Sequence, residues 1–282
     1  MDDIEIAVGE MTFTGRAAGP AGGRLVLFLH GFPQTSWSWR YQLTALGEQG
    51  YRAVAFDQRG YSPGARPEQL DLYRMEHLVA DVLGVADSLG GHTFDLVGHD
   101  WGGAVAWHVA GRYPDRLRTL TVASTPHPRA FTTALRQEGA DQATRSTYMD
   151  FFKQPDAPEQ LFLADGAAGL RGLYTATGLE GDDVEHYVEV LTQPYAMTAA
   201  LNWYRAASIG DVRGMGPITA PTLYVWSTND AALGREAAEA TGQHVDGPYR
   251  FEVLEGVSHW IAEEAPDRFT ALLADHLEGS AG

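Results

Sequence analysis

The chain has 282 residues, of which 44% are hydrophobic, enough for one large α/β domain with an insertion or for two smaller domains. Its formal net charge of −17 argues against binding nucleic acid or an anionic membrane through a basic face. The chain contains no cysteine, which excludes disulfides, thiolate catalysis and cysteine-bound metals.

Short apolar runs alternate with longer segments of helical pattern along most of the chain. Residues 4–14 are predicted to form an antiparallel hairpin at one edge of a sheet. Buried strands are predicted at 25–29, 53–56, 94–97, 117–122, 222–226 and 251–254. Helices are predicted at 37–46, 75–89, 104–112 and 266–276. Apolar strands separated by helices indicate a mostly parallel sheet covered by helices on both faces.

The alternation of strands and helices stops after residue 122 and resumes at Pro221. The intervening segment carries helical patterns punctuated by Pro155, Pro158 and Pro194. A helical insertion between two strands of the sheet is the simplest account, and we expect it to lie over the strand ends as a lid. The expected organisation is a core formed by residues 1–125 and 216–282, with a helical cap formed by residues 126–215.

The N-terminal residues are acidic and lack a basic region followed by a long apolar segment, which argues against a secretory signal. The apolar runs are much shorter than the roughly 20 residues needed to cross a bilayer. We therefore expect a cytoplasmic protein, monomeric or homodimeric, that binds neither nucleic acid nor membrane.

The most informative motif lies between a predicted strand and a predicted helix, at residues 98–103, and reads GHDWGG. It has the spacing of a nucleophile elbow, a sharp turn that pushes one side chain into an active site. Most such elbows carry Ser, whereas this one carries Asp100. A carboxylate that attacks an acyl ester would give a labile anhydride. At a saturated carbon it gives an alkyl ester that water can cleave, so epoxides and alkyl halides are the expected substrates.

An Asp nucleophile needs a base that activates water and an acid that orients the base. In α/β-hydrolases these follow the nucleophile in the order acid, then His. Asp230 follows the predicted strand 222–226, and His259 follows the predicted strand 251–254. Each lies beyond the C-terminal end of its strand, which is the edge where open parallel sheets place their sites. Either residue alone would be an ordinary loop residue, but together with Asp100 they predict a catalytic triad.

The motif HGFP at residues 30–33 follows the first buried strand and predicts an oxyanion loop. The backbone N–H groups of Phe32 and Trp101 are the expected donors, and they would stabilise the anion formed when water attacks the Asp100 ester. We also expect Phe32, Trp101 and Phe152 to contact substrate. His127, where the insertion begins, either lines the pocket or only packs.

The remaining polar candidates predict no further chemistry. His99 precedes the nucleophile and is expected to support it by packing or hydrogen bonding. Asp182 and Asp183 are expected to form a solvated turn. No pair of histidines has the spacing of a zinc helix. The sequence therefore implies neither a metal nor a cofactor.

A set of motifs resembles the epoxide hydrolase branch of the α/β-hydrolase superfamily over nearly the whole chain: HGFP at 30–33, WSWR at 37–40, DQRGYS at 57–62, GHDWGG at 98–103 and NWYR at 202–205. The resemblance implies the α/β-hydrolase fold and the hydrolysis of a small apolar epoxide to a vicinal diol. It also implies two cap tyrosines that protonate the opening oxygen, which would otherwise leave as an alkoxide. By motif these fall on Tyr204 and Tyr148, although the cap also contains Tyr174, Tyr187 and Tyr195.

Other functions remain open at this point. A haloalkane dehalogenase would use the same nucleophile and ester, with the Trp101 indole N–H holding the halide, but Phe32 stands where many such enzymes have Asn. A fluoroacetate-type dehalogenase would need arginines near the nucleophile, where Trp101 and Ala104 stand. The scaffold could also serve a binding protein that has lost catalysis, because a fold alone does not guarantee activity. Turnover that depends on Asp100 would eliminate the binding protein.

Overall fold

The structure is a computed structural model that describes residues 1–279. One eight-stranded sheet forms its centre, in the strand order β1-β2-β4-β3-β5-β6-β7-β8. β1 and β2 form an antiparallel hairpin, and β2 also pairs antiparallel with β4. The other neighbouring strands are parallel. The strands are β1 (Asp2–Val8), β2 (Met11–Ala18), β3 (Leu25–Leu29), β4 (Arg52–Phe56), β5 (Phe94–His99), β6 (Leu117–Ala123), β7 (Thr222–Asn229) and β8 (Tyr249–Ser258). The predicted α/β-hydrolase architecture is confirmed.

The predicted strands differ from the observed ones mainly at their ends. β3 has the predicted bounds because all of its residues are apolar and buried. β7 and β8 continue beyond their apolar runs, and their pairing reaches Asn229 and Ser258. An apolar pattern marks only the buried part of a strand, so it misses polar residues that still pair at the edge of the sheet.

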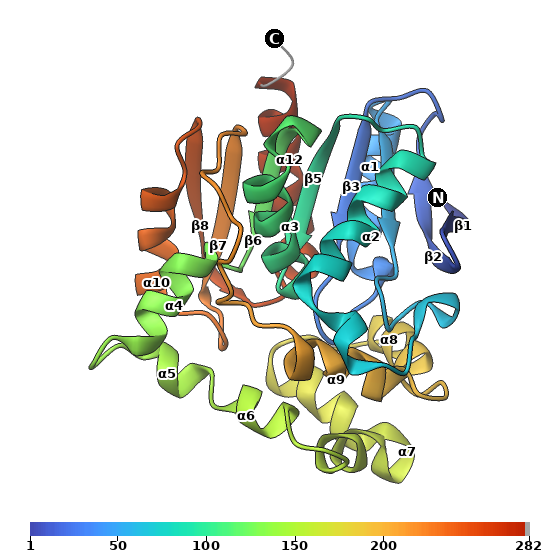
Figure 1. Ribbon diagram of the computed structural model, residues 1–282, viewed down its shortest axis with the longest axis vertical. Coiled ribbons are helices and arrows are strands. Elements are labelled where there is room, and N and C mark those ends of the chain that lie inside the picture. Colours follow the sequence, from blue (N-terminus) through green and yellow to red (C-terminus); the bar gives the residue numbers. More distant parts are fainter. Residues whose placement is uncertain (280–282) are drawn as a thin grey trace.

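Helices cover both faces of the sheet, as Figure 1 shows. On one face lie α2 (Met75–Ser88) and α3 (Trp101–Arg112), and on the other lie α1 (Arg40–Glu48) and α12 (Pro266–Gly279). The short helices α10 (Arg235–Ala240) and α11 (Ile261–Glu264) complete the core. Every residue of β5 is buried because this central strand is covered on both faces. The residue that follows β5 is therefore held by a rigid support.

The segment between β6 and β7 folds into helices that lie below the sheet in Figure 1. They are α4 (Pro128–Arg136), α5 (Gln142–Arg145), α6 (Tyr148–Phe152), α7 (Ala157–Ala176), α8 (Asp183–Leu191) and α9 (Ala196–Ala206). Residues 164–167 interrupt α7 with non-helical backbone angles. The segment that the sequence assigns to the cap, 126–215, contains all of these helices.

An ionic cluster around the buried Glu263 joins the helices of this segment to the core. The Arg40 guanidinium lies 2.6 Å from a carboxylate oxygen of Asp183 and 2.6 Å from one of Glu263. Tyr187 of α8 donates its hydroxyl to Glu263 at 2.7 Å, and Gln34 donates its amide to the same carboxylate. The expectation of a solvated turn was wrong for Asp183, because this residue begins α8 and pairs with the core. The cap is thus anchored close to the loop that carries His259.

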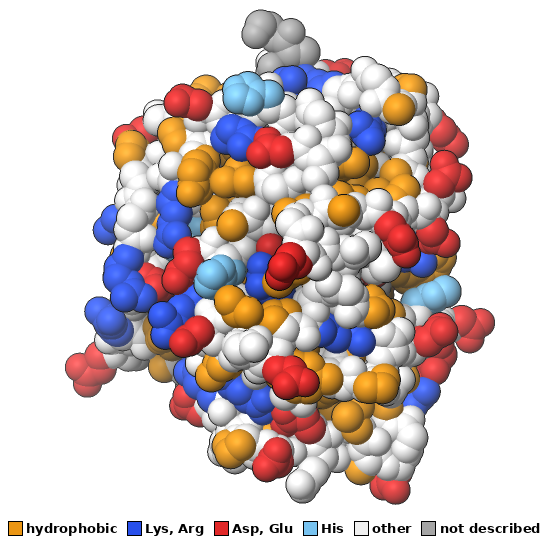
Figure 2. Space-filling view, turned by 45° about the vertical axis from the view of Figure 1, so that its right-hand side comes forward, with side chains coloured by type: hydrophobic (Ala, Val, Ile, Leu, Met, Phe, Trp, Pro, Cys, Tyr) orange, Lys and Arg blue, Asp and Glu red, His pale blue; other side chains and the backbone are white. Residues whose placement is uncertain are grey.

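Charged side chains are dispersed over the face of the molecule that Figure 2 shows. On the face that Figure 2 shows, Asp and Glu side chains are spread from the top to the bottom, with Arg side chains between them. Among the described residues, no helix is both long enough and apolar enough to span a membrane.

Candidate active site

The turn between β5 and α3 holds Asp100 in a strained backbone conformation. Its φ of 50° and ψ of −122° lie outside the regions that side-chain-bearing residues prefer. The surrounding glycines make this turn possible. A Cβ at Gly31 would collide with the Asp100 side chain, and one at Gly98 or Gly102 would collide with neighbouring backbone. The small residues of the motif are therefore required by close packing, and they aim Asp100 at the end of the sheet.

The Asp100 side chain is buried and faces backbone donors. Its Oδ1 accepts a hydrogen bond from the N–H of Phe32 at 2.9 Å. Burial raises the pKa of the Asp100 carboxyl, while His259 and the N–H groups of Trp101 and Phe32 oppose that rise without cancelling it. The two N–H donors expected from the sequence thus both act on this carboxylate. The hydroxyl of Thr125 donates to the backbone carbonyl of Asp100 at 2.7 Å, which fixes the turn from below.

His259 and Asp230 form a hydrogen-bonded pair beside Asp100. Nδ1 of His259 lies 2.9 Å from Oδ2 of Asp230, and Nε2 lies 3.8 Å from Oδ2 of Asp100. Burial alone would raise the pKa of Asp230, but His259 and the N–H groups of Ala232 and Leu233 outweigh it and lower the pKa. Burial alone would lower the pKa of His259, but the carboxylates of Asp230 and Asp100 outweigh it and raise the pKa. The imidazole is therefore oriented by an ionised carboxylate, with Nε2 turned toward Asp100.

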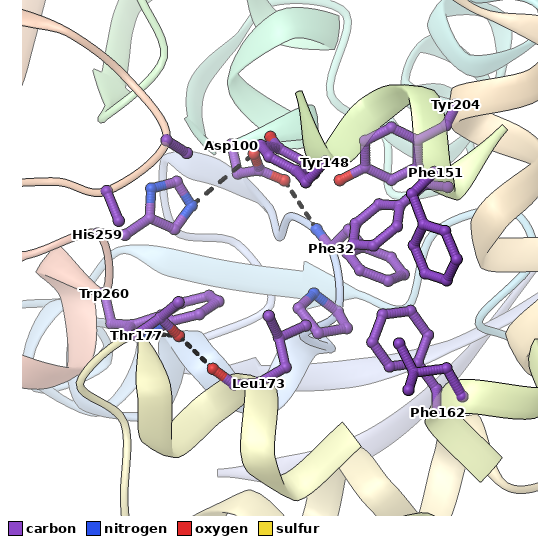
Figure 3. Close-up of a pocket in the computed structure, with 15 residues that line it drawn as sticks. Phe32, Asp100, Tyr148, Phe151, Phe162, Leu173, Thr177, Tyr204, His259 and Trp260 are labelled. Atoms are coloured by element: carbon purple, nitrogen blue, oxygen red, sulfur yellow. Dashed lines mark hydrogen bonds and ion pairs between the residues drawn. The ribbon is translucent and has the colours of Figure 1, made fainter. Parts of the chain in front are cut away.

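Tyr148 and Tyr204 face this triad from the cap. Tyr148 begins α6 and Tyr204 lies in α9, and their ring centroids are 6.3 Å apart. In Figure 3 the Tyr204 ring is directed toward Asp100 and Tyr148. Burial raises the pKa of both hydroxyls, and the negative charge of Asp100 adds to the rise. Both phenols are therefore protonated at neutral pH and can donate a hydrogen bond or a proton.

A cavity of about 370 Å³ lies between the triad and these tyrosines. Its walls come from the core and from the cap, as Figure 3 shows, and they are Phe32, Pro33, Asp100, Tyr148, Phe151, Phe152, Leu161, Phe162, Leu173, Thr177, Tyr204, Ala231, Ala232, His259 and Trp260. Leu161 lines the cavity and is 54% exposed. Among these lining residues only Asp100 and His259 are ionisable near neutral pH. The walls favour a neutral, apolar ligand.

The structure places two of the expected substrate contacts elsewhere. Phe32 and Phe152 line the cavity, but the Trp101 side chain lies behind Tyr204, with the two rings perpendicular and 5.1 Å apart. His127 also lies outside the cavity. Its imidazole accepts the N–H of Arg129 at 3.2 Å and stacks on His244 at 4.8 Å, because His127 caps the start of α4. Neither the Trp101 nor the His127 side chain lines this cavity, so of the two alternatives given for His127 the structure favours packing.

His99 provides the support expected of it. Burial, with the neighbouring His259, lowers its pKa to about 3, so the imidazole is neutral. Its Nε2 lies 2.9 Å from the carbonyl oxygen of His259 and must carry the proton, because a carbonyl only accepts. His99, the residue before Asp100, thus holds the backbone of His259.

Sequence reasoning missed residues that touch the triad or the cavity. Ser124 lies within hydrogen-bond reach of both Asp230 and His259. Trp260 and Thr177 line the cavity, and the indole N–H of Trp260 donates to the Thr177 hydroxyl at 3.1 Å. A signal for Ser124 existed: it directly follows β6, whose carboxyl end lies beside those of β5 and β7.

Comparisons with known proteins agree with this geometry. A family model described as "alpha/beta hydrolase fold" matches residues 24–266. Epoxide hydrolase 4 of Mus musculus is 37% identical over 266 residues, which cover 91% of this chain and 74% of that protein. Epoxide hydrolase A of Mycobacterium tuberculosis is 30% identical, with 93% of this chain and 92% of that protein covered. The crystal structure of Bacillus megaterium epoxide hydrolase in complex with an inhibitor matches with a TM-score of 0.88 at 28% identity, covering 98% of this chain and 100% of that one. The chain therefore belongs to the epoxide hydrolase family of the α/β-hydrolase superfamily.

Proposed function

We propose that this protein hydrolyses a small apolar epoxide to a vicinal diol through a covalent ester on Asp100. The observation that carries the proposal is the placement of groups around one apolar cavity. A carboxylate and a base lie on the core side, and two protonated phenols lie on the cap side. In this proposal residues 126–215 act as a lid that supplies the acids, while the core supplies the nucleophile and the base.

The first step opens the epoxide. Oδ1 of Asp100 is held by the N–H of Phe32, which leaves Oδ2 as the attacking atom. A bond forms between Oδ2 and one epoxide carbon while the bond from that carbon to the epoxide oxygen breaks. One of the hydroxyls of Tyr148 and Tyr204 transfers its proton to the departing oxygen, and the other donates a hydrogen bond to it. General acid catalysis of this kind typically contributes a factor of about 10² to 10⁴ in rate.

The second step cleaves the ester. Nε2 of His259 takes a proton from water, and the hydroxide attacks Cγ of Asp100. The N–H groups of Phe32 and Trp101 stabilise the resulting oxyanion, and each such donor is typically worth about 2.7–4 kcal/mol. The bond from Cγ to Oδ2 then breaks, and His259 returns a proton to the leaving alkoxide. Asp100 is left as a carboxylic acid, and its proton returns to the tyrosinate that the first step left, which restores the starting protein. The diol therefore leaves with Oδ2 as its new oxygen.

Charge changes along the reaction favour this order of steps. While Asp100 is ionised, its charge helps to raise the pKa of His259. Formation of the ester removes that charge, so the pKa of His259 falls when the residue must act as a base. Asp230 keeps its charge throughout and stabilises the imidazolium that forms.

The proposal is tested by trapping the ester in a variant that cannot activate water. His259→Gln protein is incubated separately with a panel of aryl epoxides and a panel of haloalkanes, and its intact mass is measured. The control His92→Gln makes the same change at an exposed histidine remote from the cavity and should turn over like the wild type. The double variant Asp100→Ala, His259→Gln should gain no mass.

The outcomes separate the candidate functions. An adduct from an epoxide that disappears with Asp100 supports the proposed reaction. Adducts from haloalkanes alone would make the protein a dehalogenase and leave the tyrosines without a role in the chemistry. The absence of any adduct from the folded variant, together with no diol from the wild type, would contradict the proposal.

A further inference from the structure

Ser124 occupies a constrained position beside the triad. It follows the last residue of β6, is fully buried and has a φ of 70°, in the left-handed region. Its N–H donates to the carbonyl of Val225 at 2.8 Å, and its own carbonyl accepts the hydroxyl of Tyr224 at 2.8 Å. Glycine adopts such a φ without strain, whereas a residue with a Cβ does not. The hydroxyl is thus carried by a backbone that would accommodate glycine more easily.

The hydroxyl contacts the acid and the base of the triad together. Oγ of Ser124 lies 2.9 Å from Oδ2 of Asp230 and 3.1 Å from Nδ1 of His259. Nδ1 carries a proton that points to Oδ2, because an ionised carboxylate only accepts. The Ser124 hydroxyl therefore donates its own proton to Oδ2. Oδ1 accepts the N–H groups of Ala232 and Leu233, so donors surround the whole carboxylate.

We propose that Ser124 is a positioning residue. Its hydroxyl donates a hydrogen bond to Asp230, which weakens the attraction of that carboxylate for the His259 proton, and it holds the imidazole toward Asp100. The inference rests on the proposed function, because it concerns the step in which His259 activates water. A donor on a carboxylate stabilises its charge and weakens its pull on a neighbouring proton. Without the hydroxyl, Asp230 would hold the His259 proton more tightly, and less neutral base would be present at a given pH.

The charge states of the groups that face His259 allow the effect of the Ser124 hydroxyl on its pKa to be measured. Asp230 and Asp100 are its charged neighbours, and His99 from β5 is neutral because burial lowers its pKa to about 3. Tyr148 from the cap and Tyr224 from β7 are neutral, since burial raises the pKa of each. In the ester only Asp230 keeps its charge. The acidic limb of the pH profile of ester hydrolysis then reports how strongly Asp230 raises the pKa of His259.

The test compares Ser124→Ala, which keeps the Cβ and loses the hydroxyl, with Ser124→Gly, which loses both and relieves the backbone. Thr121→Val is the matched control, because Thr121 lies in the strand that Ser124 follows and, among the described residues, its buried hydroxyl has no hydrogen-bond partner. Single turnovers of styrene oxide are quenched at intervals from about pH 5 to pH 9. Intact mass gives the rates of ester formation and ester hydrolysis at each pH.

Both Ser124 variants should form the ester within about twofold of the wild-type rate. Both variants should hydrolyse the ester more slowly near neutral pH. The acidic limb of the pH profile of this step should move upward by about half a pH unit or more. Thr121→Val should keep the wild-type profile. An unmoved limb in both Ser124 variants would overturn the inference, as would a Ser124→Gly variant that matches the wild type. If the wild type forms no ester, the proposed function fails, and this inference fails with it.

Discussion

Nε2 of His259 lies 3.8 Å from Oδ2 of Asp100. This distance is too long for a hydrogen bond, yet it is short enough for the charge on either group to change the pKa of the other. His259 and Asp100 therefore interact through charge alone in the resting protein. In the proposed reaction this leaves room for water to approach the ester, because His259 does not hydrogen-bond to Asp100.

The two chemical steps should have different pH dependences. Ester formation needs ionised Asp100, whose pKa is raised by burial, so this step is lost as the pH falls through that raised value. Ester hydrolysis needs neutral His259, and the esterified Asp100 no longer raises the pKa of the imidazole. The acidic limb of hydrolysis should thus lie below the pKa of His259 in the free protein. An NMR titration of labelled His259, compared with single-turnover hydrolysis, checks this. A limb at or above the titration value would contradict it.

The cap tyrosines should affect ring opening and leave ester cleavage unchanged. Tyr204→Phe and Tyr148→Phe should each slow ester formation from an epoxide by about 10² or more, because the departing oxygen loses a donor. Tyr195→Phe is the control, since that partly exposed hydroxyl reaches only Glu68 and Asn202 among the described residues. Ester formation is followed by mass in the His259→Gln background. Ester formation unchanged in both single variants and in their double variant would remove the tyrosines from the mechanism.

The ionic cluster of Arg40, Asp183 and Glu263 should contribute to the stability of the fold. Glu263→Gln removes the charge opposite Arg40, and loss of one partner of a buried pair typically costs about 3–5 kcal/mol. The side chain of Glu263 is only 1% exposed, so solvent cannot compensate. Urea unfolding measures the change. Glu185→Gln, which breaks the exposed pair with Arg171, should leave the midpoint almost unchanged. Equal effects of the two substitutions would show that burial of the cluster is unimportant.

The aromatic wall should set the size of the substrate. Phe162→Ala enlarges the cavity opposite the triad and should shift the ratio of kcat/KM toward bulkier aryl epoxides by about tenfold. Phe131→Ala is matched to it, because Phe131 is equally buried in the cap segment but does not line the cavity. Both should lose about 3 kcal/mol of stability. Competition between styrene oxide and a naphthyl epoxide measures the ratio, and a shift in both variants would point to a general loosening of the cap.

The sequence correctly brings Asp100, Asp230 and His259 together because each of them follows an apolar strand. Once a run such as 222–226 is recognised as a parallel strand, the loop after it must lie at the active edge of the sheet. Asp230 and His259 could therefore be placed near Asp100 without coordinates. The glycine pattern of the elbow adds to this, since close backbone packing leaves no room for a Cβ there.

Side-chain directions outside the sheet are harder to predict. His127 begins the insertion, but its role as the N-cap of α4 turns the imidazole toward Arg129. The local sequence predicts a solvated turn at Asp183, because its partner Arg40 is distant in the chain. Ser124 reads as a residue after a strand, and its contact with Asp230 depends on how β7 lies beside β6. The contacts of Asp183 and Ser124 depend on tertiary packing, which a local pattern does not encode. The His127 contact is local, but a lone His before a helix does not indicate that its side chain caps the helix.

The covalent ester is the central claim, and the fate of the water oxygen tests it most directly. Excess enzyme converts an epoxide in a single turnover in H₂¹⁸O, and the masses of the diol and of the peptide that contains Asp100 are measured. Because water attacks Cγ of Asp100, the account predicts an unlabelled diol and a label in the Asp100 carboxylate. A first-turnover diol that carries the label, with Asp100 unlabelled, would show direct attack of water on the epoxide and would contradict the account.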